Sequence, residues 1–421
     1  MKISNRKIHF FNPGHEDAIR TGQHHYTPPS SVCKMISDLA YIPAWYGNEG
    51  DYVIINEMNK VFHLLSFLPV CIRPVIFPIL PSELTQLNSP IPMEAAPWGL
   101  SPHSIHLFKT LLQPYGNMII PQWKDTYKHL TSRQTALKCL YKIKTLLPET
   151  FKFLTLPLFC STTDEMLRFM TEHPPPYLLK TPYSCSGRGL YRIRENYINH
   201  QASRWIEGAL KKQGVISIEH ELEKVCDFAM EFESNGNGRM LFIGFSVFET
   251  LSNGKYRGNL LGSQALLEQH ITNYISASLL QEIKEAVIMI LTEVISFEYN
   301  GYLGVDMLIY RKDNSFSIHP VVEINLRNTM GIVALQLSKR IVHPSSHGQL
   351  VITYDKTENG AYMTHLQMQE AYPLQFSDSK ILSGYLSLCP VTRETQFIAY
   401  VLIQEENRWK SASNFINQSK S

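Results

Sequence analysis

Two apolar segments near residue 310 are predicted to form the strands of a hairpin, and this hairpin constrains the fold more than any other feature. The segments GYLGVDMLIY (301–310) and SIHPVVEINLR (317–327) are joined by the turn-forming residues RKDNS. Strand side chains alternate between two faces, so Glu323, Asn325 and Arg327 share one face while the apolar residues between them share the other. The sequence therefore predicts an antiparallel hairpin with one polar face.

The centre of this hairpin determines which residues face each other. A centre between Asn314 and Ser315 puts Asp306 opposite Glu323. Two directly opposed carboxylates repel, so a cation is expected between them, and Asn325 adds a neutral oxygen on the same face. Mg²⁺ favours such a set of few protein oxygens, with its other positions filled by phosphate and water. A solvated sheet face would explain an isolated Glu-x-Asn, but the apolar strands and the matching aspartate favour a metal site.

A second segment, YLLKTPYSCSGRGLYRI (177–193), offers donors for a phosphate. A strand delivers Lys180, and a loop of small residues follows it. Small residues let backbone amides approach an anion closely, and basic side chains add charge. The Walker pattern Gly-x-x-x-x-Gly-Lys-Ser/Thr is absent, and Ser-Gly-Arg-Gly alone also fits an exposed turn. The candidate phosphate-binding residues are Lys180, Ser184, Ser186, Gly187, Arg188 and Gly189.

Farther along, GVISIEHELEKVCDFAMEF (214–232) joins an apolar strand to acidic residues. A purine nucleotide pocket needs a backbone hinge for the base and a carboxylate for the ribose, and this segment offers both. A solvated strand end explains the same acids equally well when they are taken alone.

Length and composition limit the function classes. The chain has 421 residues, more than one core usually organises, so two or three domains are expected. A net charge of +2 with 18% charged residues gives no basic excess for nucleic acid. No apolar run approaches the roughly 20 residues of a membrane span, so a cytoplasmic protein is expected. The seven cysteines include no Cys-x-x-Cys pair, so neither a zinc site nor a disulfide framework is suggested.

The order of patterns predicts three regions and a fold class that combines α/β with α+β. Residues 1–125 alternate short apolar runs with helical patterns, which suits a small α/β domain. Residues 126–344 hold the segments above as two α+β halves, and Thr162 with Glu165 offers a capping box for one of their helices. Residues 345–421 are predicted to form a β-rich C-terminal extension.

The order of the motifs resembles that of the ATP-grasp superfamily over residues 126–344. It runs from Lys-x-Pro through a Ser/Gly loop and an apolar strand ending in Glu to Gly-x-Asp and Val-Glu-Ile-Asn-x-Arg. Ser132-Arg133 lies where the superfamily usually has Asp-Lys or Asp-Arg. The resemblance implies an ATP-grasp fold preceded by a small α/β domain, with ATP and Mg²⁺ as cofactors.

The resemblance also implies a role for each matching residue. The phosphate ligands would be Arg133 and Lys180, with Ser186, Gly187, Arg188 and Gly189 as a lid over them. The adenine hinge would be Glu219, His220, Glu221 and Leu222, and Asp227, or Glu221 in its place, would take the ribose hydroxyls. The metal ligands would be Asp306, Glu323 and Asn325, and Arg327 would face the reacting phosphoryl group.

Two features depart from the superfamily pattern. The loop after Lys180 is richer in serine than the usual glycine-rich version. Gly304 stands where many ligases place an arginine that stabilises the acyl phosphate, so Arg327, together with Arg257, would have to take that role. A surface salt bridge is the alternative for Arg257.

The resemblance implies an ATP-dependent ligase that joins a small-molecule carboxylate to an amine or thiol through an acyl phosphate. The acceptor would bind near the loop FFNPGHED (10–17), for which a tight turn is the alternative reading. A kinase acting on a small hydroxyl compound and a non-catalytic nucleotide-binding regulator remain as alternatives, although the intact metal ligands argue against the regulator. The residues leave the substrate and the oligomeric state open.

Three isolated side chains are also candidates for functional roles. They are His15, Cys185 and His220. A lone histidine or thiol in a loop is usually exposed, so all three are expected at the surface.

Overall fold

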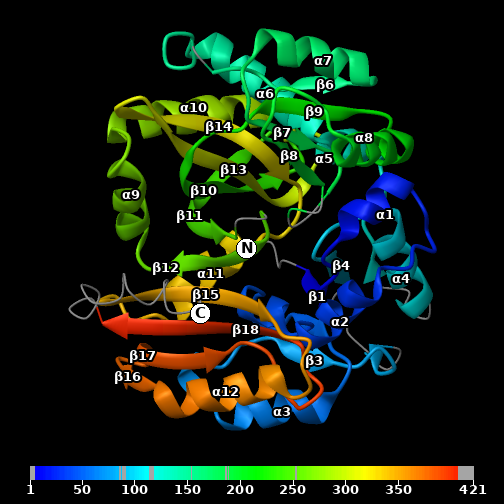
Figure 1. Ribbon diagram of the computed structural model, residues 1–421. Helices are drawn as coiled ribbons and strands as arrows, with labels where there is room; N and C mark the ends of the chain where they lie inside the picture. The colour runs from blue at the N-terminus through cyan, green and yellow to red at the C-terminus, as the bar shows by residue number, and fades with distance from the viewer. Residues whose placement is uncertain are drawn as a thin grey trace.

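The computed structural model describes residues 5–84, 87, 92–112, 118–152, 154–184, 187, 189–251 and 254–405. Within these ranges the strands form three sheets, of five, four and nine strands. Figure 1 shows the four-stranded sheet with its helices at the top, the nine-stranded sheet through the middle, and the N-terminal elements along the right and lower side. The fold therefore combines α/β with α+β, as the sequence predicted.

The N-terminal region forms the five-stranded sheet. Every strand pair in it is parallel, so each connection has to cross over the sheet. In spatial order the strands are β3 (Phe77–Ile79), β2 (Tyr52–Ile54), β1 (Arg6–Phe10), β4 (Met93–Pro97) and β5 (Met118–Ile119). The connecting helices are α1 (His15–Thr21), α2 (Ser30–Asp38), η1 (Ile42–Trp45), α3 (Met58–Ser66), η2 (Val70–Ile72) and α4 (Pro102–Leu112). This is the α/β organisation that the alternating patterns indicated.

The four-stranded sheet is antiparallel and follows two helices, α5 (Asp125–Thr131) and α6 (Arg133–Leu146). Its strands in spatial order are β6 (Leu158–Cys160), β9 (Ile216–His220), β7 (Tyr177–Lys180) and β8 (Leu190–Ile193), and its helices are α7 (Thr163–Glu172) and α8 (His200–Gln213). The capping box predicted for α7 is present, because Thr162 and Glu165 each bond the other's backbone N–H. This sheet carries Lys180 at the end of β7.

The nine-stranded sheet carries the acidic hairpin at one edge. Its strands in spatial order are β14 (Ser315–Asn325), β13 (Asn300–Lys312), β10 (Lys224–Asn235), β11 (Met240–Thr250), β12 (Tyr256–Leu261), β15 (Ser346–Tyr354), β18 (Phe397–Glu405), β17 (Lys380–Ser387) and β16 (Gln375–Ser377). The helices between them are α9 (Gln264–Thr272), α10 (Ala277–Val294), α11 (Met330–Arg340) and α12 (Gly360–Ala371). Its named strand pairs are antiparallel.

The region expected as a C-terminal extension continues this sheet. Strand β15 pairs with β12 on one side and with β18 on the other. The backbone ladder therefore runs from the acidic hairpin into the C-terminal strands without a break. The limits of the three predicted domains stay a prediction.

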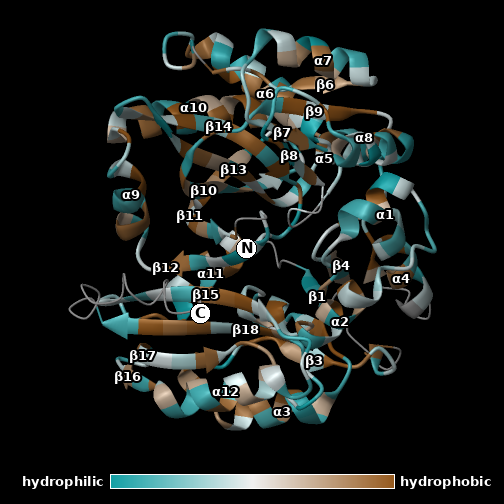
Figure 2. Cartoon of the chain, in the orientation of Figure 1, coloured by the Kyte–Doolittle hydropathy of each residue, from teal (hydrophilic) through white to brown (hydrophobic). Residues whose placement is uncertain are grey.

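One hydrophobic cluster joins the N-terminal region to the C-terminal strands. Phe11, Trp45 and Trp98 belong to the same cluster of buried side chains as Val401, and the Trp45 indole donates to the Leu388 carbonyl at 2.7 Å. Figure 2 shows hydrophobic residues concentrated on the strands of the large sheet and on the helix faces against it. This packing joins the N-terminal region to the sheet that carries the acidic hairpin.

A second cluster lies between the other end of the large sheet and α10. It contains Phe228, Met307 and Ile324 from the strands and Ile283 and Ile290 from α10. Alternate residues of β10, β13 and β14 point into it, so their polar neighbours must point to the opposite face. Among the helices of the described residues, none is both long and apolar enough to cross a membrane.

Candidate active site

The acidic hairpin consists of β13 and β14. Asp306 is directly opposite Glu323, and Gly304 is opposite Asn325. The alternation of strand side chains therefore puts Asp306, Glu323 and Asn325 on one face, as the sequence predicted. Asn325 Nδ2 donates to Asp306 Oδ2 at 3.1 Å. The three predicted metal ligands are neighbours.

The turn of this hairpin lies one residue earlier than predicted. Its two residues are Asp313 and Asn314, so the predicted centre after Asn314 is wrong. Asp306 still faces Glu323 because the register shifts between this pair and the turn, where β14 has two residues more than β13. Pro320 belongs to that longer stretch, and a residue without an N–H suits an interrupted ladder. The pairing of Asp306 with Glu323 was predicted correctly, but it depends on a bulge that was not predicted.

The charges around Asp306 indicate what this face can bind. Burial, Glu323 and Glu231 raise the pKa of Asp306 well above its ordinary value, against the opposing effect of Arg327. A divalent cation between the carboxylates would reverse this shift, and two carboxylates with one amide are the hard oxygen donors that Mg²⁺ prefers. The residues present therefore fit a magnesium ion. Across the described part of the chain, no group of three or more His, Cys, Asp or Glu side chains forms a metal site of its own.

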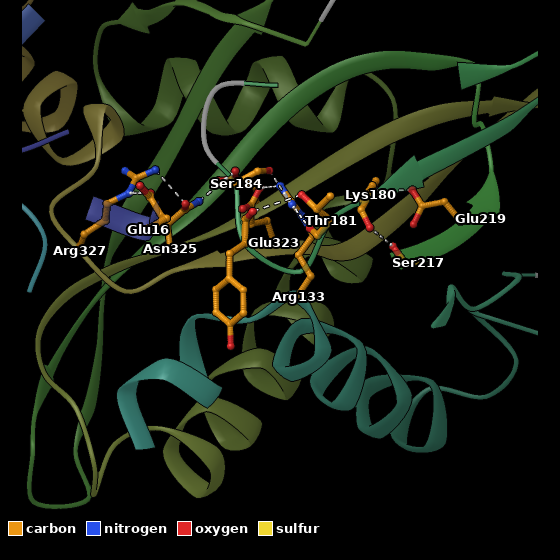
Figure 3. Close-up of polar contacts among 12 residues, drawn as sticks. Glu16, Arg133, Lys180, Thr181, Ser184, Ser217, Glu219, Glu323, Asn325 and Arg327 are labelled. Atoms are coloured by element: carbon orange, nitrogen blue, oxygen red, sulfur yellow. Dashed lines mark hydrogen bonds and ion pairs between the residues drawn. The ribbon is translucent and has the colours of Figure 1, made fainter. Parts of the chain in front are cut away.

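Arg133 connects the acidic hairpin to the loop after β7. At the first position of α6, its Nη2 donates to Glu323 Oε2 at 2.9 Å. Its Nη1 donates to the Thr181 carbonyl at 2.6 Å and to Ser184 Oγ at 2.8 Å. Figure 3 shows this guanidinium between the loop and the hairpin carboxylate. A predicted phosphate ligand and a predicted metal ligand are thus in direct contact.

Lys180 lies at the end of β7, next to the Thr181 carbonyl that Arg133 contacts. Its Nζ is 2.5 Å from Glu219 Oε1, and the two side chains are only 9% and 13% exposed. Glu219 is thus the counter-ion of Lys180 (Figure 3). The structure brings two of the predicted nucleotide residues together in an ion pair between a buried lysine and a partly buried glutamate.

The loop after Lys180 requires glycine at two of its described positions. Thr181 N donates to the Gly189 carbonyl at 3.0 Å, and a Cβ on Gly189 would lie 2.2 Å from Thr181 Oγ1. Gly187 has a φ of 73°, in the left-handed region that glycine enters without strain. The other predicted lid residues, Ser186 and Arg188, and also Cys185, lie outside the described residues.

The residues predicted to form the adenine hinge begin in the last two residues of β9 and continue beyond it. His220 is half-buried rather than exposed, because its Nδ1 lies 3.2 Å from the Pro174 carbonyl oxygen. Glu221 forms an ion pair with Arg192, and Leu222 packs against the cluster beside α10. Their contact with a nucleotide stays a prediction.

Asp227, the predicted ribose ligand, lies on the polar face of β10. Ala229 is opposite Asp306, so Asp227, two residues earlier, shares the face of the predicted metal ligands. Its carboxylate accepts a hydrogen bond from Thr250 Oγ1 at 2.9 Å and forms an ion pair with Lys224.

Arg257 lies in β12, away from the acidic hairpin along the sheet. Its Nη1 is 3.6 Å from Glu249 Oε2, and both side chains are partly exposed. This contact is the surface salt bridge that the sequence offered as the alternative. A catalytic role for Arg257 stays a prediction.

Arg327 follows β14 and uses all three guanidinium nitrogens. Its Nε donates to Glu16 Oε1 at 2.9 Å, and its Nη2 donates to Asn325 Oδ1 at 2.9 Å. Its Nη1 donates to the Asn328 carbonyl at 3.3 Å. Burial disfavours the charged guanidinium, but the surrounding carboxylates outweigh this effect and raise the pKa of Arg327. The structure thus places a charged arginine beside the predicted metal ligands (Figure 3).

Glu231 is an acid of this face that the sequence argument did not single out. It lies in β10 on the face of the predicted metal ligands and is 1% exposed. Its carboxylate accepts hydrogen bonds from Ser246 Oγ and Thr329 Oγ1, both at 2.8 Å. Burial raises the pKa of Glu231 to about 7, against the effect of these two bonds. The available signal was the spacing in DFAME, which continues the polar face from Asp227.

The Glu231 carboxylate also explains the glycine at position 304. A Cβ on Gly304 would lie 2.8 Å from Glu231 Oε2, and one on Gly331 would lie 1.8 Å from Glu231 Oε1. An arginine at position 304 would therefore collide with Glu231. Arg327 is the arginine that contacts the predicted metal ligands from the neighbouring strand end.

We expect Glu231→Gln to make protein stability less dependent on pH. The pKa of Glu231 is about 7 in the folded protein against 4.5 for the ordinary group, so the folded state binds this proton more tightly. The wild type must then lose about 3 kcal/mol of stability as the pH rises from about 4.5 to about 7. The glutamine variant lacks this loss. Urea denaturation of both proteins at several pH values measures the difference. The exposed Glu298→Gln serves as the control, and a wild-type-to-variant difference that is constant with pH would contradict the assignment.

His15 and Glu16, in the segment proposed as an acceptor loop, begin helix α1 instead of lying in a loop, and both are buried. His15 was expected at the surface, but it is only 4% exposed. Its ring packs so closely on Gly99 that a Cβ there would lie 2.3 Å from the ring. Asn12 holds this arrangement by exchanging two hydrogen bonds with the Gly99 backbone, at 2.8 and 3.1 Å. Burial lowers the pKa of His15 to about 4, so the imidazole is neutral at pH 7.

Comparisons with known proteins agree with this architecture. No protein-family model and no curated protein sequence matches the chain. The biotin carboxylase domain of 2-oxoglutarate carboxylase from Hydrogenobacter thermophilus is similar with a TM-score of 0.54 and 12% identity, over 98% of this chain and 89% of that chain. Biotin carboxylase from Campylobacter jejuni is similar with a TM-score of 0.52 and 11% identity, over 96% and 88%.

A third similar structure is N5-carboxyaminoimidazole synthetase from Staphylococcus aureus. Its TM-score is 0.51 and its identity 13%, over 98% of this chain and 96% of that chain. These proteins are ATP-grasp enzymes, so the chain has the ATP-grasp fold, and the resemblance in motif order is confirmed for the fold. At such identities the likeness describes the fold alone.

Proposed function

We propose that this protein is an ATP-dependent ligase that joins a small-molecule carboxylate to an amine, or to a thiol. The observation that carries the proposal is the pair of contacts made by Arg133. This side chain bonds Ser184, in the loop after Lys180, and also Glu323 of the acidic hairpin. A triphosphate with its metal needs cationic donors and acidic metal ligands within one site. The Arg133 contacts support such a site here.

The residues divide the binding of a metal nucleotide between the two halves of the site. Lys180 and Arg133 would hold the phosphates, and Asp306, Glu323 and Asn325 would hold magnesium, which supplies charge neutralisation when bound. The structure of the Staphylococcus synthetase contains ADP, and that of the Hydrogenobacter domain contains MgADP and bicarbonate. Those complexes support ATP and Mg²⁺ as the cofactors of this chain.

The proposed reaction proceeds in two displacements. The substrate carboxylate takes the terminal phosphoryl group of ATP, and ADP leaves. The amine then attacks the acyl carbon, inorganic phosphate leaves, and the amine loses a proton. Arg327, charged and beside the metal ligands, would stabilise the negative charge that develops on the transferring group. The protein positions the reactants and neutralises charge, so no covalent side-chain nucleophile is required.

We expect Lys180→Met to weaken nucleotide binding by about 10- to 100-fold, the effect of one lost charge-assisted hydrogen bond. Calorimetric titration with ADP and magnesium measures this change. Lys142→Met is the matched control, since it breaks an exposed lysine–glutamate pair at 2.7 Å on another surface. Unchanged ADP affinity of Lys180→Met would remove Lys180 from the proposed site.

The reaction class can be tested without knowing the substrate. Mixtures of amino acids, dipeptides, amines, carboxylates and polyols are screened for metal-dependent ADP release, and each product is identified by mass. A ligase releases ADP and free phosphate only when a carboxylate and a nucleophile are both supplied. Phosphate retained on a product would indicate a kinase instead. Binding of ATP without ADP release in any mixture would indicate a regulator.

A further inference from the structure

Arg327 is held by a carboxylate from the opposite end of the chain. Its Nε bond to Glu16 Oε1, at 2.9 Å, connects residues 311 positions apart. Glu16 lies in α1 of the N-terminal region and is 6% exposed. Burial by itself would raise the pKa of Glu16, but the neighbouring His15, 3.4 Å away, and then the Arg327 guanidinium outweigh it, and the pKa is lowered. An ionised carboxylate of the N-terminal region thus reaches the edge of the predicted metal site (Figure 3).

The contact continues from Arg327 to the metal ligands through the amide of Asn325. Asn325 Oδ1 accepts from Arg327 Nη2, and Asn325 Nδ2 donates to Asp306 Oδ2. This amide orientation is the one that satisfies both partners, because a guanidinium can only donate and a carboxylate can only accept. The oxygen of Asn325 is therefore turned toward Arg327 and away from Asp306.

Metal binding places a conflicting demand on the same amide. Mg²⁺ beside Asp306 requires the oxygen of Asn325 and not its nitrogen. Turning the amide would present its NH₂ group to Arg327 Nη2, and two donors cannot bond each other. Arg327 would then lose its bond to Asn325, while the bond from Nε to Glu16 involves a different nitrogen and is unaffected. Arg327 Nη1 also keeps its longer bond to the Asn328 carbonyl, at 3.3 Å, so Glu16 is the charged partner that holds Arg327 through this change.

We propose, on the basis of the proposed ligase function, that Glu16 is a positioning residue that anchors Arg327 Nε while Asn325 turns its oxygen to the metal. Nη2 of Arg327 then becomes available to the transferring phosphoryl group. The N-terminal region thereby completes the catalytic site with a buried charge, in addition to any part in acceptor binding. The ligase site is incomplete without α1.

The proposal is tested with Glu16→Gln, which keeps the shape and a hydrogen-bond acceptor but removes the charge. We expect kcat with hydroxylamine as the amine to fall by about 10- to 100-fold, because a misplaced catalytic group costs on this order. KM for ATP and the affinity for ADP with magnesium should stay within about threefold, since Lys180 and Arg133 are intact. In an Arg327→Met background, Glu16→Gln should have no further effect, because it acts only through Arg327.

The matched control is Arg340→Met. Arg340 also links the two regions, by donating to the Gly47 carbonyl at 2.8 Å, but it lies outside the proposed site. We expect its kcat to equal that of the wild type even if its melting temperature falls. A fall in kcat for Arg340→Met as large as for Glu16→Gln would show that Glu16 acts only through general docking, and would overturn the proposal.

A second measurement does not depend on turnover. The ¹⁵N resonance of Arg327 Nε–H, assigned by its loss in Arg327→Met, is recorded with magnesium and ADP present. We expect it to be protected from exchange with water in the wild type and to exchange faster in Glu16→Gln, because a neutral amide oxygen accepts more weakly than a carboxylate. Equal exchange in both proteins, or equal kcat in both, would overturn the role of Glu16 but leave the proposed function standing. A wild type with no metal-dependent ADP binding or release would overturn the proposed function as well.

Discussion

Glu323→Gln is expected to lower magnesium-dependent ATP turnover by about 10³-fold, since a metal ion supplies several kcal/mol of charge stabilisation to the transition state. Glu323 is the carboxylate opposite Asp306 and a partner of Arg133. Its amide analogue keeps the shape but loses the charge that both a metal and Arg133 require. ADP release is measured across a magnesium titration for the wild type and the variant.

The fold should survive this substitution. From the sequence alone, the loss of repulsion toward Asp306 would leave the melting temperature equal or slightly higher. The structure adds an opposing effect, because Glu323→Gln also breaks the ion pair with Arg133. The Arg133 and Glu323 side chains are 9% and 26% exposed, so the lost pair and the lost repulsion oppose each other at one partly buried site. A melting temperature close to that of the wild type is expected.

The control for Glu323→Gln is Glu293→Gln, which changes the same residue type in an exposed ion pair with Lys142. We expect this control to retain wild-type turnover. Magnesium-dependent ADP release by Glu323→Gln at near the wild-type rate would exclude Glu323 as a metal ligand.

Arg327→Met is expected to lower kcat by about 10²- to 10³-fold, the cost of removing one preorganised charge donor. Nucleotide affinity should change far less, because Lys180 and Arg133 remain. The measurement compares kcat, KM for ATP and ADP affinity, with hydroxylamine as the amine and hydroxamate as the product. Arg311→Met, which breaks an exposed pair with Glu223 at 3.1 Å, should leave all three unchanged.

A different pattern of kcat and affinity changes would assign another role to Arg327. If the variant lost ADP affinity and kept kcat at saturating ATP, Arg327 would be a nucleotide ligand rather than a group that acts on the transition state. If both parameters were unchanged, the polar face of the hairpin would have no catalytic arginine at this position.

The hairpin was predictable because its information is local. Alternation in VVEINLR fixed the face shared by Glu323 and Asn325, and the order of motifs led to the fold that the structural comparisons support. The turn position was wrong by one residue because the bulge that contains Pro320 leaves no signal in the alternation. The shift of the turn and the extra residues of the bulge change the register in opposite directions, so Asp306 still pairs with Glu323.

The remaining features depend on contacts that no local pattern encodes. The bond between Glu16 and Arg327 forms only because the N-terminal sheet packs on the C-terminal strands. His15, which a loop position alone placed at the surface, is buried by its packing on Gly99, 84 residues away in the sequence. The position of Glu231 was visible in the spacing of β10, but its importance follows from Gly304 and Gly331, which leave the space for its carboxylate.

The central claim, that a carboxylate is activated by ATP at this site, is tested most directly by following carboxylate oxygen. Mixtures of ¹⁸O-labelled carboxylates are incubated with the protein, ATP, magnesium and hydroxylamine, and the inorganic phosphate is analysed by mass. Formation and aminolysis of an acyl phosphate must transfer one ¹⁸O atom from the carboxylate to phosphate, so singly labelled phosphate is the predicted result. ADP formed with unlabelled phosphate, or with phosphate retained on a hydroxyl product, would contradict the ligase assignment.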